Sequence, residues 1–157
     1  MKSSQNTRRI LILGIGNPGR QDDALGILLS DKIKDWINRE SIKFVDIDQN
    51  YQLNIEDAEK IANYDFVVFA DASVAEIDEC KLEPVIPDLK TDFSMHSVTP
   101  SYILALCNNL FTKTPEVYQL HIKGYKWEFM HEISKKAEKN LDKAFQILSS
   151  FILEITG

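Results

Sequence analysis

The chain has 157 residues, of which 44% are hydrophobic and 27% charged, a composition typical of globular proteins. The formal net charge of −6 argues against a nucleic-acid partner, because a protein that binds phosphate backbones needs a basic surface. Residues 1–7 are polar and lack the apolar core of a signal peptide, and Cys80 and Cys107 are isolated thiols that suit a reducing compartment. We therefore expect one domain over residues 1–157, with residues 1–7 flexible, in a cytoplasmic protein that does not enter a membrane and is a monomer when free.

Short apolar runs alternate with helix-patterned segments along the whole chain. This pattern predicts strands at 9–13, 42–47, 66–70 and 117–123, and a weaker edge strand at 80–85. It predicts helices at 22–38, 54–63, 99–111 and 134–155. The order predicts an α/β fold, a three-layer sandwich in which helices cover both faces of a mainly parallel twisted sheet of about five strands.

The most informative stretch is 9–26, where an apolar strand ends in a glycine-rich loop and two carboxylates follow. Glycine permits a tight turn and close approach of the backbone. An acid at a helix N-terminus usually caps it, and we expect Asp22 to do so. Asp23 is then redundant as a cap, which favours a functional role. Gly26 costs helix stability, so it predicts close packing against the sheet or a ligand.

Gly14 to Gly19 satisfies the G-x-G-x-x-G pattern of dinucleotide-binding loops. The remaining sequence does not favour this interpretation, because Asp22 and Asp23 occupy the helix N-terminus where a pyrophosphate would bind. The acids at the end of the second predicted strand also lie further along the chain than the roughly 20 residues at which a ribose-binding acid is expected.

The same loop resembles the G-x-G-N-P-G opening of the peptidyl-tRNA hydrolases. In that family a histidine-bearing element follows the loop, whereas here no histidine precedes His96. The acidic composition also suits a tRNA substrate poorly. An esterase of this kind is a lesser alternative.

A second carboxylate and an imidazole fall in places where they can join Asp23. Asp71 follows the apolar run 66–70, and His96 lies in a loop just before a helix. Because the C-terminal ends of parallel strands meet at one edge of a sheet, we expect the three side chains to lie together. Two carboxylates and an imidazole suit a divalent first-row metal with open coordination positions. Structural roles are the alternative: Asp71 could cap a turn, and His121 and His131 are expected to be structural or surface residues.

Three elements in this order resemble the [NiFe]-hydrogenase maturation endopeptidases. They are Leu13–Asn17 followed by Asp22–Gly26, then Phe69–Ala72, then His96–Pro100. The segment Gly124–Glu128, before the last helix, also looks like that of some members.

The resemblance implies an endopeptidase that removes a C-terminal extension from the nickel-loaded precursor of the hydrogenase large subunit. It implies that Asp23, Asp71 and His96 contact the metal, and that Asp23 or Asp71 activates water or the metal polarises the scissile region. The nickel would arrive with the substrate, so no permanent cofactor is expected. A nickel- or precursor-binding chaperone that does not cleave would use the same side chains and is the main alternative.

One loop departs from the family pattern. Many members follow the second strand with an Asp-Gly-Gly-Thr type turn, whereas this chain has a polar loop at 48–53. We expect that loop to line the substrate cleft, with Asn17, Gln49 and Tyr51 binding the substrate. The aromatic segment 125–129 is either a docking surface or a lid packed over the last helix.

Overall fold

The computed structural model describes residues 7–90 and 98–157, and within them one five-stranded sheet. Its strands are β1 (Ile10–Ile15), β2 (Val45–Asn50), β3 (Phe66–Ser73), β4 (Cys80–Pro84) and β5 (Glu116–Lys123). They lie in the order β2-β1-β3-β5-β4. The pairs β1–β2, β1–β3 and β3–β5 are parallel, and the edge strand β4 runs antiparallel to β5. The predicted sheet and its edge strand are therefore confirmed.

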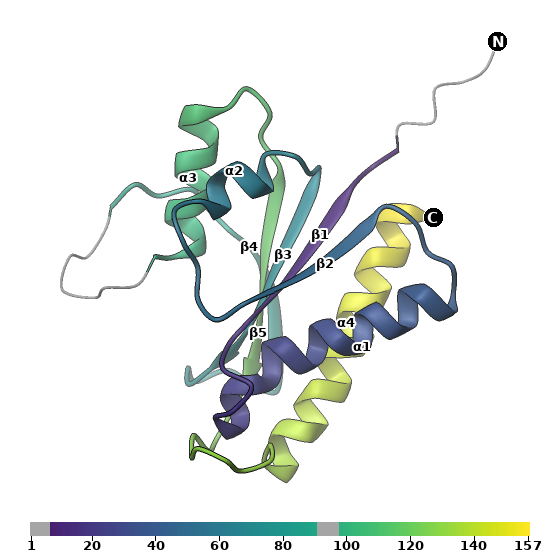
Figure 1. Cartoon of the computed structure of the whole chain (residues 1–157), viewed down its shortest axis with the longest axis vertical. Coiled ribbons are helices and arrows are strands. Elements are labelled where there is room, and N and C mark those ends of the chain that lie inside the picture. The colour runs from purple at the N-terminus through teal and green to yellow at the C-terminus, as the bar shows by residue number, and fades with distance from the viewer. Residues whose placement is uncertain (1–6, 91–97) are drawn as a thin grey trace.

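Helices cover both faces of this sheet (Figure 1). They are the short 3₁₀ helix η1 (Gln21–Ala24), α1 (Leu25–Arg39), α2 (Asp57–Ile61), α3 (Pro100–Leu110) and α4 (Lys135–Thr156). The long helices α1 and α4 lie on one face, and α2 and α3 lie on the other. This arrangement is the three-layer α/β sandwich predicted from the order of the elements. Among the described residues, no helix is both long and apolar enough to cross a membrane.

The two faces of the sheet build two separate cores. All six residues of β1 are buried, and they alternate between the cores because successive strand side chains point to opposite faces. Ile10 and Ile12 pack under α1 and α4, whereas Leu11 and Leu13 pack under α2 and α3. Cys107 is buried in the second core, which confirms its packing role.

The second strand begins and ends later than the predicted range 42–47. Phe44 has φ of 70°, a turn conformation, so extended backbone starts only at Val45. The strand then continues to Asn50, because Gln49 and Asn50 pair with Gly14 and Ile15 of β1. The expected polar loop at 48–53 was therefore wrong in its first half, since residues 48–50 are strand.

The helix starts follow the expected side-chain chemistry in two of the longer helices. Thr99 accepts a hydrogen bond from the Tyr102 amide at 3.1 Å, and Pro100 is the first residue of α3. Ser134 accepts from the Ala137 amide at 3.3 Å and caps α4. The second helix is shorter than the predicted 54–63, because only Asp57–Ile61 is helical.

Candidate functional site

The glycines after β1 place the start of α1 directly on the ends of two strands. A Cβ atom at Gly26 would lie 2.3 Å from the carbonyl oxygen of Ala70 and 2.4 Å from that of Ile15. Gly26 is thus the point where the helix crosses β1 and β3, which confirms the predicted close packing. Gly16 has φ of 146°, and a Cβ there would lie 2.0 Å from the Asp23 carbonyl oxygen. Only glycine allows this approach, which holds Asp23 against the end of β1.

Asp71 lies at the same edge of the sheet, just after the residue that Gly26 contacts. It belongs to β3, is half-buried, and points to the face covered by α2 and α3, since it alternates with the buried Phe69. Burial and the neighbouring Asp23 carboxylate raise the pKa of Asp71 to about 7, although the Ala72 N–H opposes the shift. The structure therefore brings Asp23 close enough to Asp71 for its charge to raise the pKa of Asp71.

The third residue of the predicted metal set, His96, lies outside the described residues. Within 7–90 and 98–157, no three or more His, Cys, Asp and Glu side chains are grouped to hold a metal ion. Asp23 and Asp71 offer carboxylate oxygens, which ligate first-row divalent metals when ionised. The described part of the site is a pair of carboxylates at the C-terminal edge of a parallel sheet, where α/β folds bind ligands.

His121 is the neighbour of Asp71 in the sheet, and its contact with Glu83 agrees with the structural or surface role expected from the sequence. It is the partner of Asp71 in the parallel pairing of β3 and β5, so both side chains leave the same face of the sheet. Its Nε2 lies 2.8 Å from Oε1 of Glu83 on β4, and hydrogen bonds from His121 and Lys81 lower the pKa of Glu83. The period-two pattern of β5 was visible in the sequence, but the register that aligns His121 with Asp71 was not.

The predicted substrate-binding residues separate into two groups. The Asn17 amide donates to the Tyr51 hydroxyl at 2.6 Å, so the glycine loop and the end of β2 meet there. Gln49 lies on the face of β2 that α1 covers, where its amide donates to Ser30 Oγ at 2.8 Å and Asp31 Oδ1 at 2.6 Å. The structure joins Asn17 and Tyr51 but directs Gln49 to α1.

Asp22 does not cap a helix, which corrects the sequence-based expectation. The caps of η1 and α1 are Arg20 and Ala24, and neither forms a side-chain capping bond. Asp22 is instead fully buried, and its carboxylate accepts hydrogen bonds from Tyr125 N, Lys126 N, Ser134 N and Ser134 Oγ at 2.7 to 3.0 Å. Burial alone would raise the pKa of Asp22, but these hydrogen bonds outweigh it and lower the pKa below the usual value.

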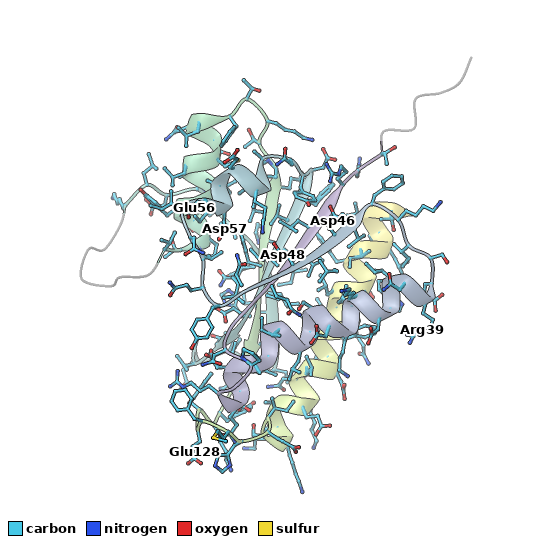
Figure 2. The ribbon with its side chains drawn as sticks, in the orientation of Figure 1. Arg39, Asp46, Asp48, Glu56, Asp57 and Glu128 are labelled. Carbon is cyan, nitrogen blue, oxygen red and sulfur yellow. The ribbon has the colours of Figure 1, made fainter. Side chains whose placement is uncertain are left out.

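Loop 124–134, which leads into α4, is therefore fastened to turn 20–24 (Figure 1). The Arg20 Nε donates to the Trp127 carbonyl at 3.1 Å, and the Glu128 amide donates to Gln21 Oε1 at 3.1 Å. Figure 2 shows Glu128 at the end of the molecule where α1 begins. The loop serves partly as a lid and partly as exposed surface: Tyr125 accepts from Asn140 of α4 at 3.1 Å, whereas Phe129 is 67% exposed.

Comparison with solved structures shows that this fold is shared with hydrogenase maturation proteases. A crystal structure of the [NiFe] hydrogenase maturation protease HycI from Thermococcus kodakarensis KOD1 aligns with a TM-score of 0.73 and 22% identity, over 96% of this chain and 95% of that one. The hydrogenase maturating endopeptidase HybD from E. coli aligns with a TM-score of 0.71 and 18% identity, over 93% of each chain. A solution structure of an endopeptidase from Escherichia coli aligns with a TM-score of 0.67 and 20% identity, over 95% of this chain and 94% of that one.

No protein-family model matches the sequence, and no curated protein matches it. The resemblance drawn from the sequence motifs is thus supported by the fold. At these identities the structural likeness establishes the fold alone.

Proposed function

We propose that this chain is an endopeptidase that removes a C-terminal extension from the nickel-loaded precursor of a [NiFe]-hydrogenase large subunit. The observation that carries the proposal is the Asp23–Asp71 pair, at the edge of a sheet whose fold matches named hydrogenase maturation proteases over nearly the whole chain. We infer the substrate class from those structurally similar proteases and from the resemblance of the sequence motifs. The residues named for the chemistry come from this chain.

The pair has the properties that peptide hydrolysis at a metal-bearing substrate requires. A group whose pKa is near 7 can take or give a proton at neutral pH, and the pKa of Asp71 is raised to about 7. The charge of the neighbouring Asp23 carboxylate is one cause of that raised pKa, after burial. We assign both carboxylates to contact with the substrate's nickel, and Asp71, once it has lost its proton, also to activation of water.

The nickel belongs to the substrate in this proposal, and the protease senses it. Asp23 and Asp71 would contact the ion through oxygen, with His96 as the third ligand. A carboxylate must lose its proton to bind a metal, so nickel-loaded precursor would displace the proton that Asp71 carries near neutral pH. The protein would then need no metal of its own.

Mass spectrometry of a large-subunit precursor tests the proposal. The precursor is incubated with the protein in nickel-loaded and nickel-free form, and its intact mass is measured. Loss of a C-terminal peptide from the nickel-loaded form alone is the expected result. Cleavage of both forms would keep the protease and contradict the sensing role of the three ligands.

A matched pair of variants tests whether the carboxylate pair is responsible for cleavage of the precursor. Asp71→Asn should abolish cleavage. Asp46→Asn should not, because Asp46 pairs with Leu11 in the first half of β1 and lies away from the start of α1 (Figure 2). Binding of the precursor without any shortening by the wild-type protein would instead favour the chaperone, which would use the same side chains without cleaving.

A further inference from the structure

Asp22 is a fully buried carboxylate directly beside the candidate catalytic Asp23, yet its side-chain bonds go to a distant segment. Its oxygens accept from the amides of Tyr125, Lys126 and Ser134 and from the Ser134 hydroxyl, which lie more than 100 residues further along the chain. Hydrogen bonds to an ionised acceptor are about twice as strong as neutral ones. Asp22 is thus a strong fastening between turn 20–24 and loop 124–134.

The backbone of the turn adds further contacts to the same loop. The Asp22 amide donates to the Lys126 carbonyl at 3.1 Å, and the Met130 amide donates to the Gly19 carbonyl at 3.0 Å. Gln21 has φ of 40°, an uncommon conformation for a residue other than glycine, which persists only where surrounding contacts enforce it. Its side chain receives the Glu128 amide, so loop 124–134 also supplies that contact.

Asp23 depends on this arrangement because its own side chain is not held. Among the described residues the Asp23 carboxylate accepts no hydrogen bond and forms no ion pair, whereas its amide donates to the Arg20 carbonyl at 2.9 Å. Its position near Asp71 therefore depends on the backbone of turn 20–24. Whatever holds that turn also sets the geometry of the carboxylate pair.

We propose that Asp22 is a positioning residue: by fastening loop 124–134 onto turn 20–24, it fixes the Asp23 carboxylate next to Asp71. The expected effect of Asp22 on cleavage rests on the proposed endopeptidase function, whereas its effect on the position of Asp23 does not. Loop 124–134, which carries the exposed Phe129 and Met130, then helps to hold the site in place, and a displacement of this loop would move Asp23.

Asp22→Asn is the test variant, because it keeps the shape and replaces one accepting oxygen with an NH₂ group that faces N–H or O–H donors. Asp65→Asn is the matched control. Asp65 also accepts a backbone hydrogen bond, from the Arg9 amide at 2.8 Å, but it precedes β3 and so lies at the opposite end of that strand from Asp71. Both changes remove a charge and weaken a backbone contact, and only one of them touches turn 20–24.

Two readouts separate positioning from a general loss of stability. In precursor cleavage, Asp22→Asn should lower kcat by about 100-fold, as expected for a misplaced reacting group. KM should stay within about twofold, because substrate binding is not the affected step. Asp65→Asn should leave both kcat and KM unchanged when the rates are corrected for the fraction of folded protein. A rise in KM at constant kcat, or equal losses in the two variants, would overturn the proposal.

Amide hydrogen exchange followed by NMR gives the second readout, which needs no activity. In Asp22→Asn the amides of Asp23, Tyr125 and Lys126 should exchange faster together, and in Asp65→Asn they should not. If the wild-type protein cleaves nothing, the proposed function fails and this readout alone decides the role of Asp22. Unchanged protection at Asp23 would overturn the positioning role.

Should Asp22→Asn fail to fold, Ser134→Ala replaces it, because it removes one of the donors to the Asp22 carboxylate and leaves the others. The same loss in kcat and the same coupled exchange are then expected in weaker form. Unchanged kcat with unchanged exchange at Asp23 would overturn the proposal.

Discussion

At the scale of single residues, the two neighbouring acids of the glycine loop have opposite environments. Asp22 is buried among donors that lower its pKa, whereas Asp23 is half-buried and raises the pKa of Asp71 by its charge. Adjacent positions in the sequence thus serve different purposes, one in structure and one in the proposed chemistry. Environment assigns the roles, because the side chains are chemically identical.

Asp71→Asn should change how stability depends on pH. A carboxyl group whose pKa is raised in the folded state stabilises that state fully only below the unfolded pKa of 3.8, and the contribution is lost as pH rises to about 7. The variant has no such loss. Between about pH 4 and 7, the difference in free energy of unfolding between the variant and the wild type should shift in favour of the variant by about 1 to 4 kcal/mol, and above pH 7 it should stay constant.

Urea unfolding of both proteins across this pH range measures that difference. The result depends on the slope and not on the absolute stability, so a constant packing cost of the amide does not affect it. Parallel stability curves would show that Asp71 titrates normally in the folded protein.

Asp23→Asn should lower the pKa of Asp71. The charge of Asp23 is the second cause of the raised value, after burial, so removing it should leave a smaller upward shift. Carbon-13 NMR titration of the Asp71 carboxyl measures the change directly, and Asp46→Asn is the control that should leave it in place. An unchanged Asp71 pKa in Asp23→Asn would mean that the two carboxylates do not interact.

At the scale of elements, close backbone contact positions the site. The start of α1 crosses the ends of β1 and β3 through Gly26, and loop 124–134 fastens the turn that precedes the helix. These contacts place a helix start, two strand ends and a distant loop at one edge of the sheet. Figure 1 shows the beginning of α1 and the loop leading into α4 together at that end.

Gly26→Ala should destabilise the protein, although alanine is the better helix former by about 1 kcal/mol. The added Cβ would lie 2.3 and 2.4 Å from two backbone carbonyl oxygens, and backbone cannot move aside as a flexible side chain can. We expect a net loss of about 1 to 3 kcal/mol, as for other overpacked sites. Thermal or urea unfolding measures it.

Lys34→Ala, on the exposed side of the same helix, is the matched control for Gly26→Ala. It changes helix propensity without touching the sheet and should alter stability by no more than about 0.5 kcal/mol. A stabilising Gly26→Ala would show that α1 can shift away from the strands, contrary to the close contact described above.

At the scale of the whole molecule, the sequence predicted the architecture well because its signals are local. Buried apolar runs such as that of β1 and the capping residues Thr99 and Ser134 mark their elements within a few positions. The start of β2 was missed because a turn with positive φ at Phe44 leaves little mark in the sequence. Its end was missed because β1 supplies pairing partners as far as Ile15.

The site could be predicted only in part, for the same reason. Asp23 and Asp71 could be placed together because parallel strand ends share an edge. The true role of Asp22 depends on partners more than 100 residues away, and the place of His121 beside Asp71 depends on strand register. Neither leaves a local pattern in the chain. The third predicted ligand, His96, lies outside the described residues and stays a prediction.

The central claim is that Asp23 and Asp71 work as one unit in cleaving the precursor. The most direct test compares cleavage rates of nickel-loaded precursor by the wild type, Asp23→Asn, Asp71→Asn and the double variant. Residues that act as a unit are not additive, so each single variant should lose nearly as much activity as the double one. Losses that multiply, or a single variant that cleaves at the wild-type rate, would contradict the account.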